Sequence, residues 1–259
     1  MIRGLYTSAT GMMAQMQQLD VVANNMANVN TTGFRGARAV QSSFPDTLMA
    51  SMQARSPSTS LHNARTVGGA SMGTFVQDIA INFSSGALQQ TGGALDLAIT
   101  GDGFFTINVP AANEETIQMY TRNGAFTISH DGYLITLNGY HVAGQGFSSI
   151  AIPHGDIYIN TSGAIYVDNQ YIDTLQMASF EDLTMLSQHG YNLFALEPGV
   201  EAEEFEGHVT QGFLEASNVN SIREMISLIN ISRAYEINQR MVTIHDNILS
   251  QAVNEIARR

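Results

Sequence analysis

The chain contains no cysteine, no tryptophan and no lysine among its 259 residues. Without cysteine it can form neither disulfide bonds nor thiolate metal sites. No stretch approaches the roughly 20 apolar residues that span a bilayer, so the sequence predicts no membrane insertion. Residues 1–15 also lack the continuous apolar run of a cleaved signal peptide, because Thr7, Ser8, Thr10 and Gly11 interrupt them. The sequence predicts either retention inside the cell or export without a cleaved signal.

Basic residues are scarce and unevenly placed. The 11 arginines face 23 acidic residues, which gives a formal net charge of −12. Residues 1–38 sum to +2 and residues 221–259 to +1, whereas residues 39–220 sum to −15. Nucleic-acid binding normally needs a basic stripe that displaces counterions from phosphates, so this balance predicts no nucleic-acid partner. Near-neutral ends flank a strongly acidic middle.

The N-terminal segment has the pattern of a helix that ends near Asn28. Its apolar residues repeat at spacings of four and three, as in a heptad seam: Leu5, Ala9, Met12, Met16, Leu19, Ala23 and Met26. Between residues 4 and 34 the only charged side chain is Asp20. A solvated helix normally carries charges opposite its core stripe, so we expect another chain to cover the outer face. The alternative is an uncharged but free surface helix.

The next two segments differ in character. Residues 35–73 have an irregular pattern, with a short helix predicted around Phe44 to Gln53. Residues 74–215 are rich in short β-type runs. These predict strands at Thr74 to Phe83, Leu95 to Thr100, Phe104 to Val109, Ala125 to Ser129, Tyr133 to Leu137, Asp156 to Asn160, Ala164 to Val167, Ile172 to Phe180 and Leu193 to Glu197, with a short helix at Glu181 to Gln188. Hairpin turns are predicted at Asn123-Gly124, Asp131-Gly132 and Asn138-Gly139.

The C-terminal segment predicts one long helix from about Ser221 to Ala257. Ser221 and Glu224 fit a capping box, and no proline or glycine follows Gly212. Its apolar positions shift phase between Ile229 and Ile237, so the stripe is broad enough for more than one neighbour. The predicted fold class is α+β: an N-terminal helix (1–34), a connecting segment (35–73), an inserted acidic antiparallel β-rich domain (74–215) and a C-terminal helix (216–259).

Motifs for catalysis or ligand binding are weak throughout. Gly101-Asp102-Gly103 lacks the third glycine and the following helix of a dinucleotide fingerprint. The seven histidines are scattered, and no G-x-S-x-G motif occurs. We therefore predict no catalytic residue, no metal site and no cofactor, and interpret the chain as non-enzymatic. Two alternatives stay open: an exported cell-wall hydrolase using a carboxylate pair that includes Asp131, and a monomeric envelope-binding β module.

Four signatures spread along the chain carry a resemblance to a known family. They are Ala23-Asn24-Asn25-Met26-Ala27-Asn28-Val29-Asn30-Thr31-Thr32-Gly33-Phe34, then Leu95-Asp96-Leu97-Ala98-Ile99 with Gly101-Asp102-Gly103-Phe104-Phe105, then Tyr120-Thr121-Arg122-Asn123-Gly124-Ala125-Phe126, and last Gly212-Phe213-Leu214-Glu215-Ala216-Ser217-Asn218-Val219-Asn220 leading to Arg233-Ala234-Tyr235-Glu236-Ile237-Asn238. In this order they resemble the rod and hook axial proteins of the bacterial flagellum. The chain is most similar to the distal rod proteins and their hook–basal-body paralogues. It departs from many members at Arg35, where they have lysine.

The resemblance implies a structural role in motility. The two terminal helices would pair as a coiled coil in a helical homopolymer, a tube that transmits torque and encloses the export channel. Implied partners are sister copies, neighbouring rod and hook axial proteins, the flagellar type III export apparatus and ring proteins. The implied location is the basal body, outside the cytoplasmic membrane. The expected assembly interface comprises Leu5, Met12, Met16, Leu19, Asn24, Asn25, Met26, Asn28, Asn30, Gly33, Phe34, Asn218, Tyr235, Ile237, Met241, Ile244 and Ile248.

The asparagines of the first signature have two interpretations. Their amides donate and accept at once, which suits a crowded interface between subunits where a charge would be costly. The alternative interpretation is that Asn24, Asn25, Asn28 and Asn30 cap the helix and form the following turn within the chain. Both roles can coexist.

Overall fold

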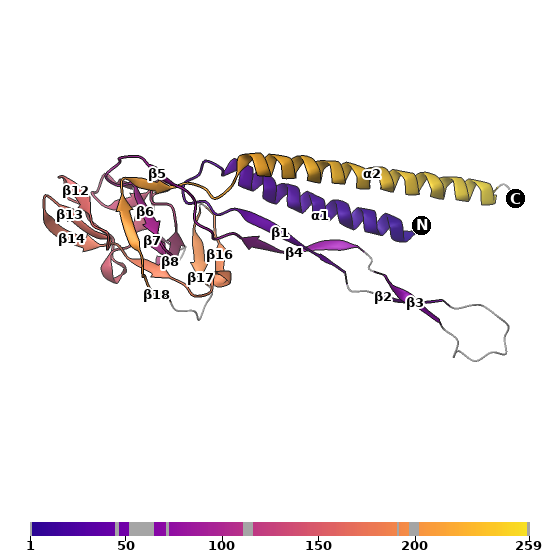
Figure 1. Cartoon of the computed structure of the whole chain (residues 1–259), viewed down its shortest axis with the longest axis horizontal. Helices are drawn as coiled ribbons and strands as arrows, with labels where there is room; N and C mark the ends of the chain where they lie inside the picture. Colours follow the sequence, from indigo (N-terminus) through magenta and orange to yellow (C-terminus); the bar gives the residue numbers. More distant parts are fainter. Residues whose placement is uncertain are drawn as a thin grey trace. The chain divides into compact units, whose positions relative to one another are not determined.

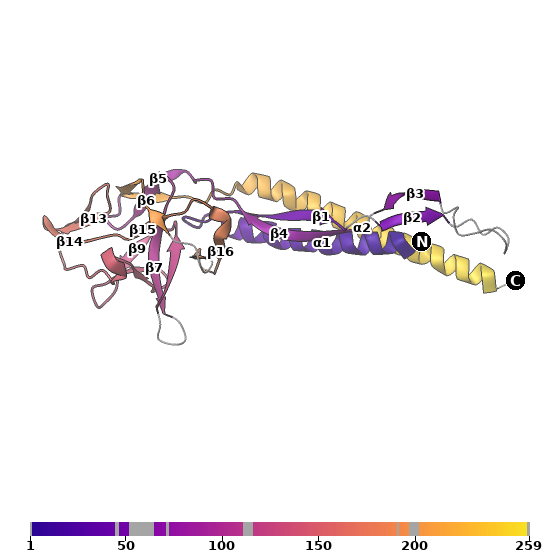
Figure 2. The same ribbon diagram turned by 90° about the horizontal axis from the view of Figure 1, so that it is seen from below.

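The computed structural model describes residues 2–44, 47–51, 65–70, 73–110, 116–190, 192–196 and 202–257 (Figures 1 and 2). Its contacts divide the chain into two compact units, each assembled from separate stretches of sequence. The helical unit comprises Met1–Met26, Ala37–Ile81 and Ser221–Arg259, and the β unit comprises Ala27–Gly36 and Asn82–Asn220. This division places the predicted connecting segment with the terminal helices.

Two long helices form most of the helical unit. They are α1 (Ile2–Ala27) and α2 (Ser221–Ala257), and they run side by side in both ribbon views (Figures 1 and 2). The Asn238 amide donates to Gln15 Oε1 at 3.1 Å. A Cβ atom added at Gly4 would lie 2.5 Å from His245 Nε2, so the missing side chain permits this close approach. Both predicted helices are confirmed. Neither helix of the described chain is long and apolar enough to cross a membrane.

The remainder of the helical unit is antiparallel β-structure. Strand β1 (Ala37–Ser43) pairs with β4 (Thr74–Ile81), and a bulge falls between Val40 and Gln41. Strand β2 (Thr47–Ser51) pairs with β3 (Arg65–Ala70). The short helix predicted around Phe44 to Gln53 is therefore wrong for Thr47–Ser51, because cross-strand pairing overrides the local preference of this segment.

The β unit consists of short strands whose pairings are all antiparallel, as predicted. The strands are β5 (Leu88–Gln90), β6 (Leu97–Thr100), β7 (Phe104–Pro110), β8 (Thr116–Thr121), β9 (Phe126–Ile128), β10 (Leu134–Thr136), β11 (His141–Val142), β12 (Ile157–Ile159), β13 (Ala164–Val167), β14 (Gln170–Thr174), β15 (Met177–Ser179), β16 (Leu186–Gln188), β17 (Phe194–Leu196), β18 (Glu203–Glu204), β19 (His208–Gln211) and β20 (Phe213–Glu215). The largest sheet runs β16-β17-β8-β7-β11-β10-β9, with β15 joining β7 to β18. Strands β12-β13-β14 form another sheet, and β19 pairs with β6 and β20 with β5.

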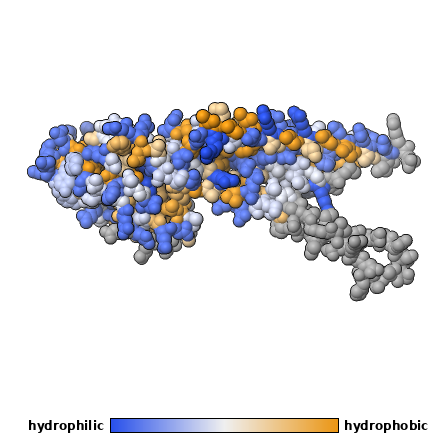
Figure 3. Space-filling model, in the orientation of Figure 1, coloured by the Kyte–Doolittle hydropathy of each residue, from blue (hydrophilic) through white to orange (hydrophobic). Residues whose placement is uncertain are grey.

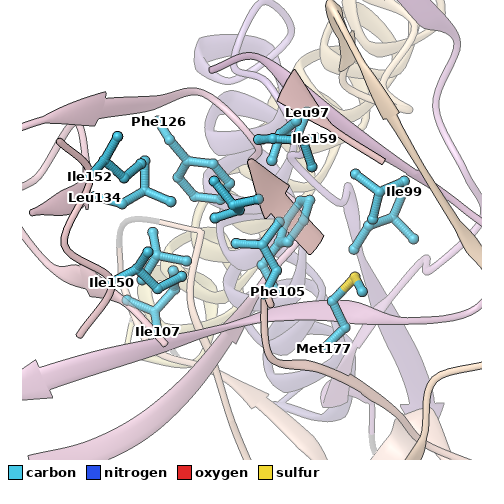
Figure 4. Close-up of a cluster of buried hydrophobic side chains, with 14 of the residues drawn as sticks. Leu97, Ile99, Phe105, Ile107, Phe126, Leu134, Ile150, Ile152, Ile159 and Met177 are labelled. Atoms are coloured by element: carbon cyan, nitrogen blue, oxygen red, sulfur yellow. The ribbon is translucent and has the colours of Figure 1, made fainter. Parts of the chain in front are cut away.

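One hydrophobic core fills the β unit. Side chains from β6, β7, β9, β10, β12 and β15 meet in it, as the close-up in Figure 4 shows. Leu97, Phe105, Ile107 and Leu134 are fully buried. Burial of each such side chain contributes roughly 1.5–3 kcal/mol before the entropy of ordering is subtracted.

Three local predictions in the β unit are wrong. Asn123-Gly124 is not a hairpin turn, because β8 pairs with β7 and β17 while β9 pairs with β10. Gly124 instead meets the backbone of Leu97, where an added Cβ would lie 1.8 Å from the carbonyl oxygen. The strand predicted at Ile172 to Phe180 is interrupted between β14 and β15. The helix predicted at Glu181 to Gln188 shrinks to the 3₁₀ turn η3 (Leu183–Met185) followed by β16.

Candidate functional site

Segments of all four sequence signatures meet in the β unit. The Gly33 amide donates to the Glu215 carbonyl at 2.8 Å and thereby joins the first signature to the fourth. The Leu97 amide donates to the Gly124 carbonyl at 3.0 Å, and the Gly212 amide donates to the Asp96 carbonyl at 2.8 Å. We call this set of joined segments (27–36, 95–105, 120–126 and 212–220) the signature network.

A buried ion pair lies at the centre of the signature network. Arg35 Nη1 stands 2.7 Å from Glu215 Oε1, and each side chain is 1% exposed. The same Arg35 nitrogen donates to the Ser84 carbonyl at 2.9 Å. The Gly86 amide donates to Glu215 Oε1 at 2.7 Å. The pair therefore ties the segment after α1 to β20 and to the segment that follows β4.

A second buried arginine faces the same carboxylate. Arg122 Nη1 lies 3.6 Å from Glu215 Oε2, and Nη2 donates to the Gly101 carbonyl at 2.7 Å. Its guanidinium carbon also lies 5.1 Å from the Phe104 ring centroid, a cation–π distance. Burial lowers the pKa of Arg122 to about 10; Glu215 opposes the shift, and Arg35 reinforces it. Two guanidinium groups thus share one carboxylate, and removing that carboxylate would leave both buried charges unpaired.

Asn218 makes a second polar connection within the β unit. Its Oδ1 accepts from the Gly36 amide at 2.8 Å, and its Nδ2 donates to the carbonyls of Asn82 and Ser84 at 2.7 and 2.9 Å. The first and third signatures are joined separately, since the Thr32 hydroxyl donates to Asn123 Oδ1 at 2.6 Å. These side chains hold together stretches that are far apart in sequence.

Asn25 makes the equivalent connection in the helical unit. Its Nδ2 donates to the Ala37 carbonyl at 2.8 Å, and its Oδ1 accepts from the Ala37 amide at 2.9 Å. Nδ2 also lies 3.4 Å from Glu224 Oε2 in the first turn of α2. Asn25 is 4% exposed. These contacts correspond to the intrachain role expected for Asn25. Both polar atoms of its side-chain amide form hydrogen bonds within the protomer.

The other expected interface residues fall into three groups by exposure. Gly33 and Phe34 are buried in the β unit. A half-buried group contains Leu5, Met12, Leu19, Met26, Asn28, Asn218 and Tyr235. An exposed group contains Met16, Asn24, Asn30, Ile237, Met241, Ile244 and Ile248. Among the α1 side chains that the structure describes (residues 3–27), the buried ones are Ser8, Ala14 and Asn25, so the heptad seam is not a core of this protomer.

Exposed apolar side chains are concentrated on α2. They are Ile222, Met225, Ile226, Ile229, Ile237, Met241, Ile244, Ile248 and Val253, each at least 43% exposed. Figure 3 shows apolar residues gathered along this helix. Exposed apolar side chains in this number on one helix are typical of an interaction site.

Sequence reasoning missed the buried charges of the signature network. Arg35, Arg122 and Glu215 lie within or beside the signatures but were not expected to act together, since a single sequence does not show which distant charges will meet. Among the described residues, no group of three or more His, Cys, Asp or Glu side chains is placed to hold a metal ion.

Comparisons with known proteins show the class of protein to which the chain belongs. Three family models match: the flagella basal body rod protein at residues 5–35, the flagellar hook protein FlgE/F/G D1 domain at 98–167, and the flagellar basal body rod FlgEFG protein C-terminal region at 210–255. Together they define a flagellar axial structural protein. The chain is 36% identical to the basal-body rod protein FlgG of Agrobacterium fabrum, with 96% of this chain and 97% of the relative covered. It is 32% identical to FlgF of Caulobacter vibrioides (100% and 99% covered) and 32% identical to FlgG of Bacillus subtilis (98% and 99% covered).

The chain belongs to the flagellar basal-body rod protein family. This family is structural, and its members' names give no support to the cell-wall hydrolase or the envelope-binding module.

Proposed function

We propose that the protein is a structural, non-enzymatic subunit of the flagellar rod that polymerises through its two terminal helices. The observation that carries this proposal is the exposed apolar surface of α2, where Ile237, Met241, Ile244 and Ile248 face solvent in the single chain. Covering one such side chain contributes roughly 1.5–3 kcal/mol, so several together supply a strong drive to associate. Sister copies supply the matching surface on α1, whose Met13 and Met16 are also exposed.

The geometry of this association is a helical tube. The contact pairs different surfaces of neighbouring subunits, and such a contact propagates as a filament when the rotation between subunits does not close a ring. In this arrangement α1 and α2 form a coiled coil and enclose the export channel, and the assembled tube transmits torque. Neighbouring rod and hook axial proteins and ring proteins would contact the finished structure, and the subunit would reach it through the type III export apparatus.

The segments expected from the sequence have separate roles in this proposal, although residues 27–34 and 216–220 lie in the β unit and residues 74–81 in the helical unit. Residues 1–34 and 216–259 are the polymerisation segments, and residues 74–215 carry the acidic charge. The excess of carboxylates in residues 74–215 keeps this segment of one subunit from associating with the same segment of another, because like charges repel. Association is therefore confined to the helices.

A double substitution on α2 tests the proposal. Ile237→Gln with Ile244→Gln should keep the helix, because glutamine forms helices well, but should abolish assembly of purified protein as seen by sedimentation and electron microscopy. The matched control is Asn247→Gln, which changes an exposed polar position of the same helix. Wild-type assembly by the double variant, with unchanged circular dichroism, would contradict the proposal.

A further inference from the structure

Three tyrosines form a row across the sheet of β12, β13 and β14, which Figure 1 shows within the β unit. Tyr158 on β12 pairs in register with Tyr166 on β13, and Tyr166 pairs with Tyr171 on β14. Residues directly opposite each other in antiparallel strands project from the same face of the sheet. We call these three residues the tyrosine row. It lies outside the signature network and outside the two helices.

The tyrosine row lies on the outer face of its sheet. Side chains alternate between the two faces of a strand, and the neighbouring Ile159, Ile165 and Val167 are buried in the hydrophobic core. Tyr158 and Tyr171 are instead 60% and 52% exposed. The core therefore covers one face of this sheet, and the opposite face presents aromatic rings to solvent.

The three rings are inclined to one another. The ring centroids of Tyr158 and Tyr166 are 6.3 Å apart with 40° between the planes, and those of Tyr166 and Tyr171 are 5.9 Å apart with 69° between the planes. The Tyr171 hydroxyl lies 2.9 Å from Thr174 Oγ1, a hydrogen bond that orients the ring. The rings do not form one flat platform. Each face carries the negative part of the ring quadrupole and attracts a cation placed over it.

Carboxylates lie beside the tyrosine row at the start of β12. Asp156 precedes Tyr158 by two positions and therefore projects from the same face. Asp168, in the turn between β13 and β14, accepts a hydrogen bond from the Asp156 amide through Oδ1 at 3.0 Å. Both aspartates are exposed. Residues 123–222 contain neither arginine nor lysine, so this part of the chain supplies no basic side chain of its own to the rings.

We propose that the tyrosine row binds a partner protein through an arginine-rich segment of that protein. The guanidinium groups lie over the tyrosine faces and pair with the carboxylates of Asp156 and Asp168. Arginine suits both contacts better than lysine, because its planar group stacks on rings and matches the geometry of a carboxylate. The acidic surroundings disfavour nucleic acid and other anionic partners. The site lies wholly in the β unit, so it can fail while polymerisation through the helices holds, and the reverse.

The test is a titration of dilute full-length protein, labelled with nitrogen-15, with the peptide Gly-Arg-Gly-Arg-Gly-Arg at low salt. Amide chemical shifts of Tyr158, Tyr166 and Tyr171 should change saturably. The dissociation constant should rise with ionic strength, because salt screens exposed charges. The same peptide with glutamine in place of each arginine should cause no saturable change. The absence of saturable shifts at the tyrosine row with the arginine peptide would overturn the proposal.

Ring variants separate contact with the tyrosine row from general attraction to an acidic protein. Tyr158→Thr with Tyr171→Thr keeps the net charge and places a β-favouring residue at both positions. It should weaken binding at least about fivefold, since each exposed cation–π contact accounts for about two- to fivefold. Tyr158→Phe keeps the ring face and should bind like the wild type, as should Tyr133→Thr outside the row. Equal affinity of the double variant and the wild type would overturn the proposal.

A charge variant tests the carboxylates and stays decisive if the double ring variant fails to fold. Asp156→Asn should weaken binding about twofold, as expected for one exposed ion pair. Glu181→Gln makes the same change of charge at an exposed position elsewhere in the β unit and should leave the affinity unchanged. Equal effects of the two variants would overturn the assigned contact with Asp156.

Two other occupants of the tyrosine row give different results. Saturable shifts at the row with the tetramer of N-acetylglucosamine, and none with the arginine peptide, would overturn the proposal in favour of a glycan. Self-association of the wild type in sedimentation that the double ring variant abolishes would overturn it in favour of a second copy of the chain.

Discussion

Arg35 and Glu215 form an ion pair at 2.7 Å, although 180 positions separate them in the sequence and each is 1% exposed. The pair joins the segment that follows α1 to the strand β20 that precedes α2. Because Arg122 faces the same carboxylate, Glu215 compensates two buried positive charges. Beside the hydrophobic core, this single carboxylate therefore contributes to the stability of the β unit.

Glu215→Gln should destabilise the β unit strongly. The neutral amide leaves Arg35 and Arg122 buried without compensation, for which we expect a loss of about 3–5 kcal/mol in the free energy of unfolding. Urea denaturation of the full-length protein measures the loss. Glu181→Gln, at an exposed position of the same unit, should change the free energy by less than about 0.5 kcal/mol. Equal values for the two variants would contradict the assigned role.

Arg35→Lys should be tolerated far better than Arg35→Met. A single Arg35 nitrogen, Nη1, bonds to both Glu215 and Ser84, while the Nε and Nη2 atoms have no hydrogen-bond partner. One ammonium can take over both bonds and leaves fewer donors unsatisfied, so the loss should stay near 1 kcal/mol. Arg35→Met leaves Glu215 without its nearest partner and should cost about 3 kcal/mol or more. Denaturation curves of both variants decide the point.

The pH dependence of stability should reveal the cost of burying Arg122. Its pKa in the folded protein is lowered to about 10 by burial, so above that pH the unfolded chain, whose arginine keeps its higher ordinary pKa, binds more protons than the folded chain. Stability contributed at this position therefore rises as pH rises through about 10. The free energy of unfolding of wild type minus that of Arg122→Met should shift in favour of wild type between about pH 9 and 11. A shift of opposite sign would show that burial does not disfavour the charged form of Arg122.

Gly33 should tolerate alanine less well than Gly139. Both have positive φ, 66° and 86°, so both substitutions carry a conformational cost of about 1–2 kcal/mol. A Cβ at Gly33 would also lie 2.4 Å from the Asn123 amide nitrogen, whereas that at Gly139 meets nothing within 4 Å. Thermal or urea unfolding should show Gly33→Ala as the less stable variant by a further 1–3 kcal/mol or so. Similar losses of stability in the two variants would mean that the backbone at Gly33 and that at Asn123 separate at little cost in free energy.

Asn25→Leu should impair assembly while the β unit stays folded. The substitution removes the hydrogen-bond partner of both the amide and the carbonyl of Ala37, at roughly 1–3 kcal/mol for each group left unsatisfied. The chain then loses its fixed path from α1 into β1. Amide exchange at Ala37 should accelerate, exchange at Ile107 should not change, and cells with this variant alone should lose motility. Normal motility of these cells would contradict the proposed role of Asn25 in assembly.

Sequence periodicity predicted the elements whose formation depends on local pattern. The seam from Leu5 to Met26 and the Ser221–Glu224 start located both helices, and Asp131-Gly132 and Asn138-Gly139 located hairpin turns, because glycine adopts positive φ there at little cost. Asn123-Gly124 looks the same in sequence, yet its glycine serves close backbone contact with Leu97. That difference depends on Leu97, 27 residues away in the sequence, which a local pattern does not contain.

The candidate site was predictable to a similar degree. The signatures pointed to the right segments, and the apolar positions of α2 were found from their spacing. The ion pair between Arg35 and Glu215 was not, since nothing near either residue in the sequence indicates its partner. Asn25 was expected to serve either an interface or the chain itself, and the intrachain bonds emerged only with the register of β1.

Hydrogen exchange measured on dilute monomer and on assembled polymer tests the central claim most directly. In a single chain few side chains of α1 are buried, and ordering about 30 residues costs roughly 1–2 kcal/mol for each. We therefore predict rapid exchange of the α1 amides in the monomer, slow exchange of β7 in both states, and strong protection of α1 and α2 in the polymer. Amides of α1 that are already as protected as those of β7 in the dilute monomer would contradict the claim that these helices are stabilised by assembly.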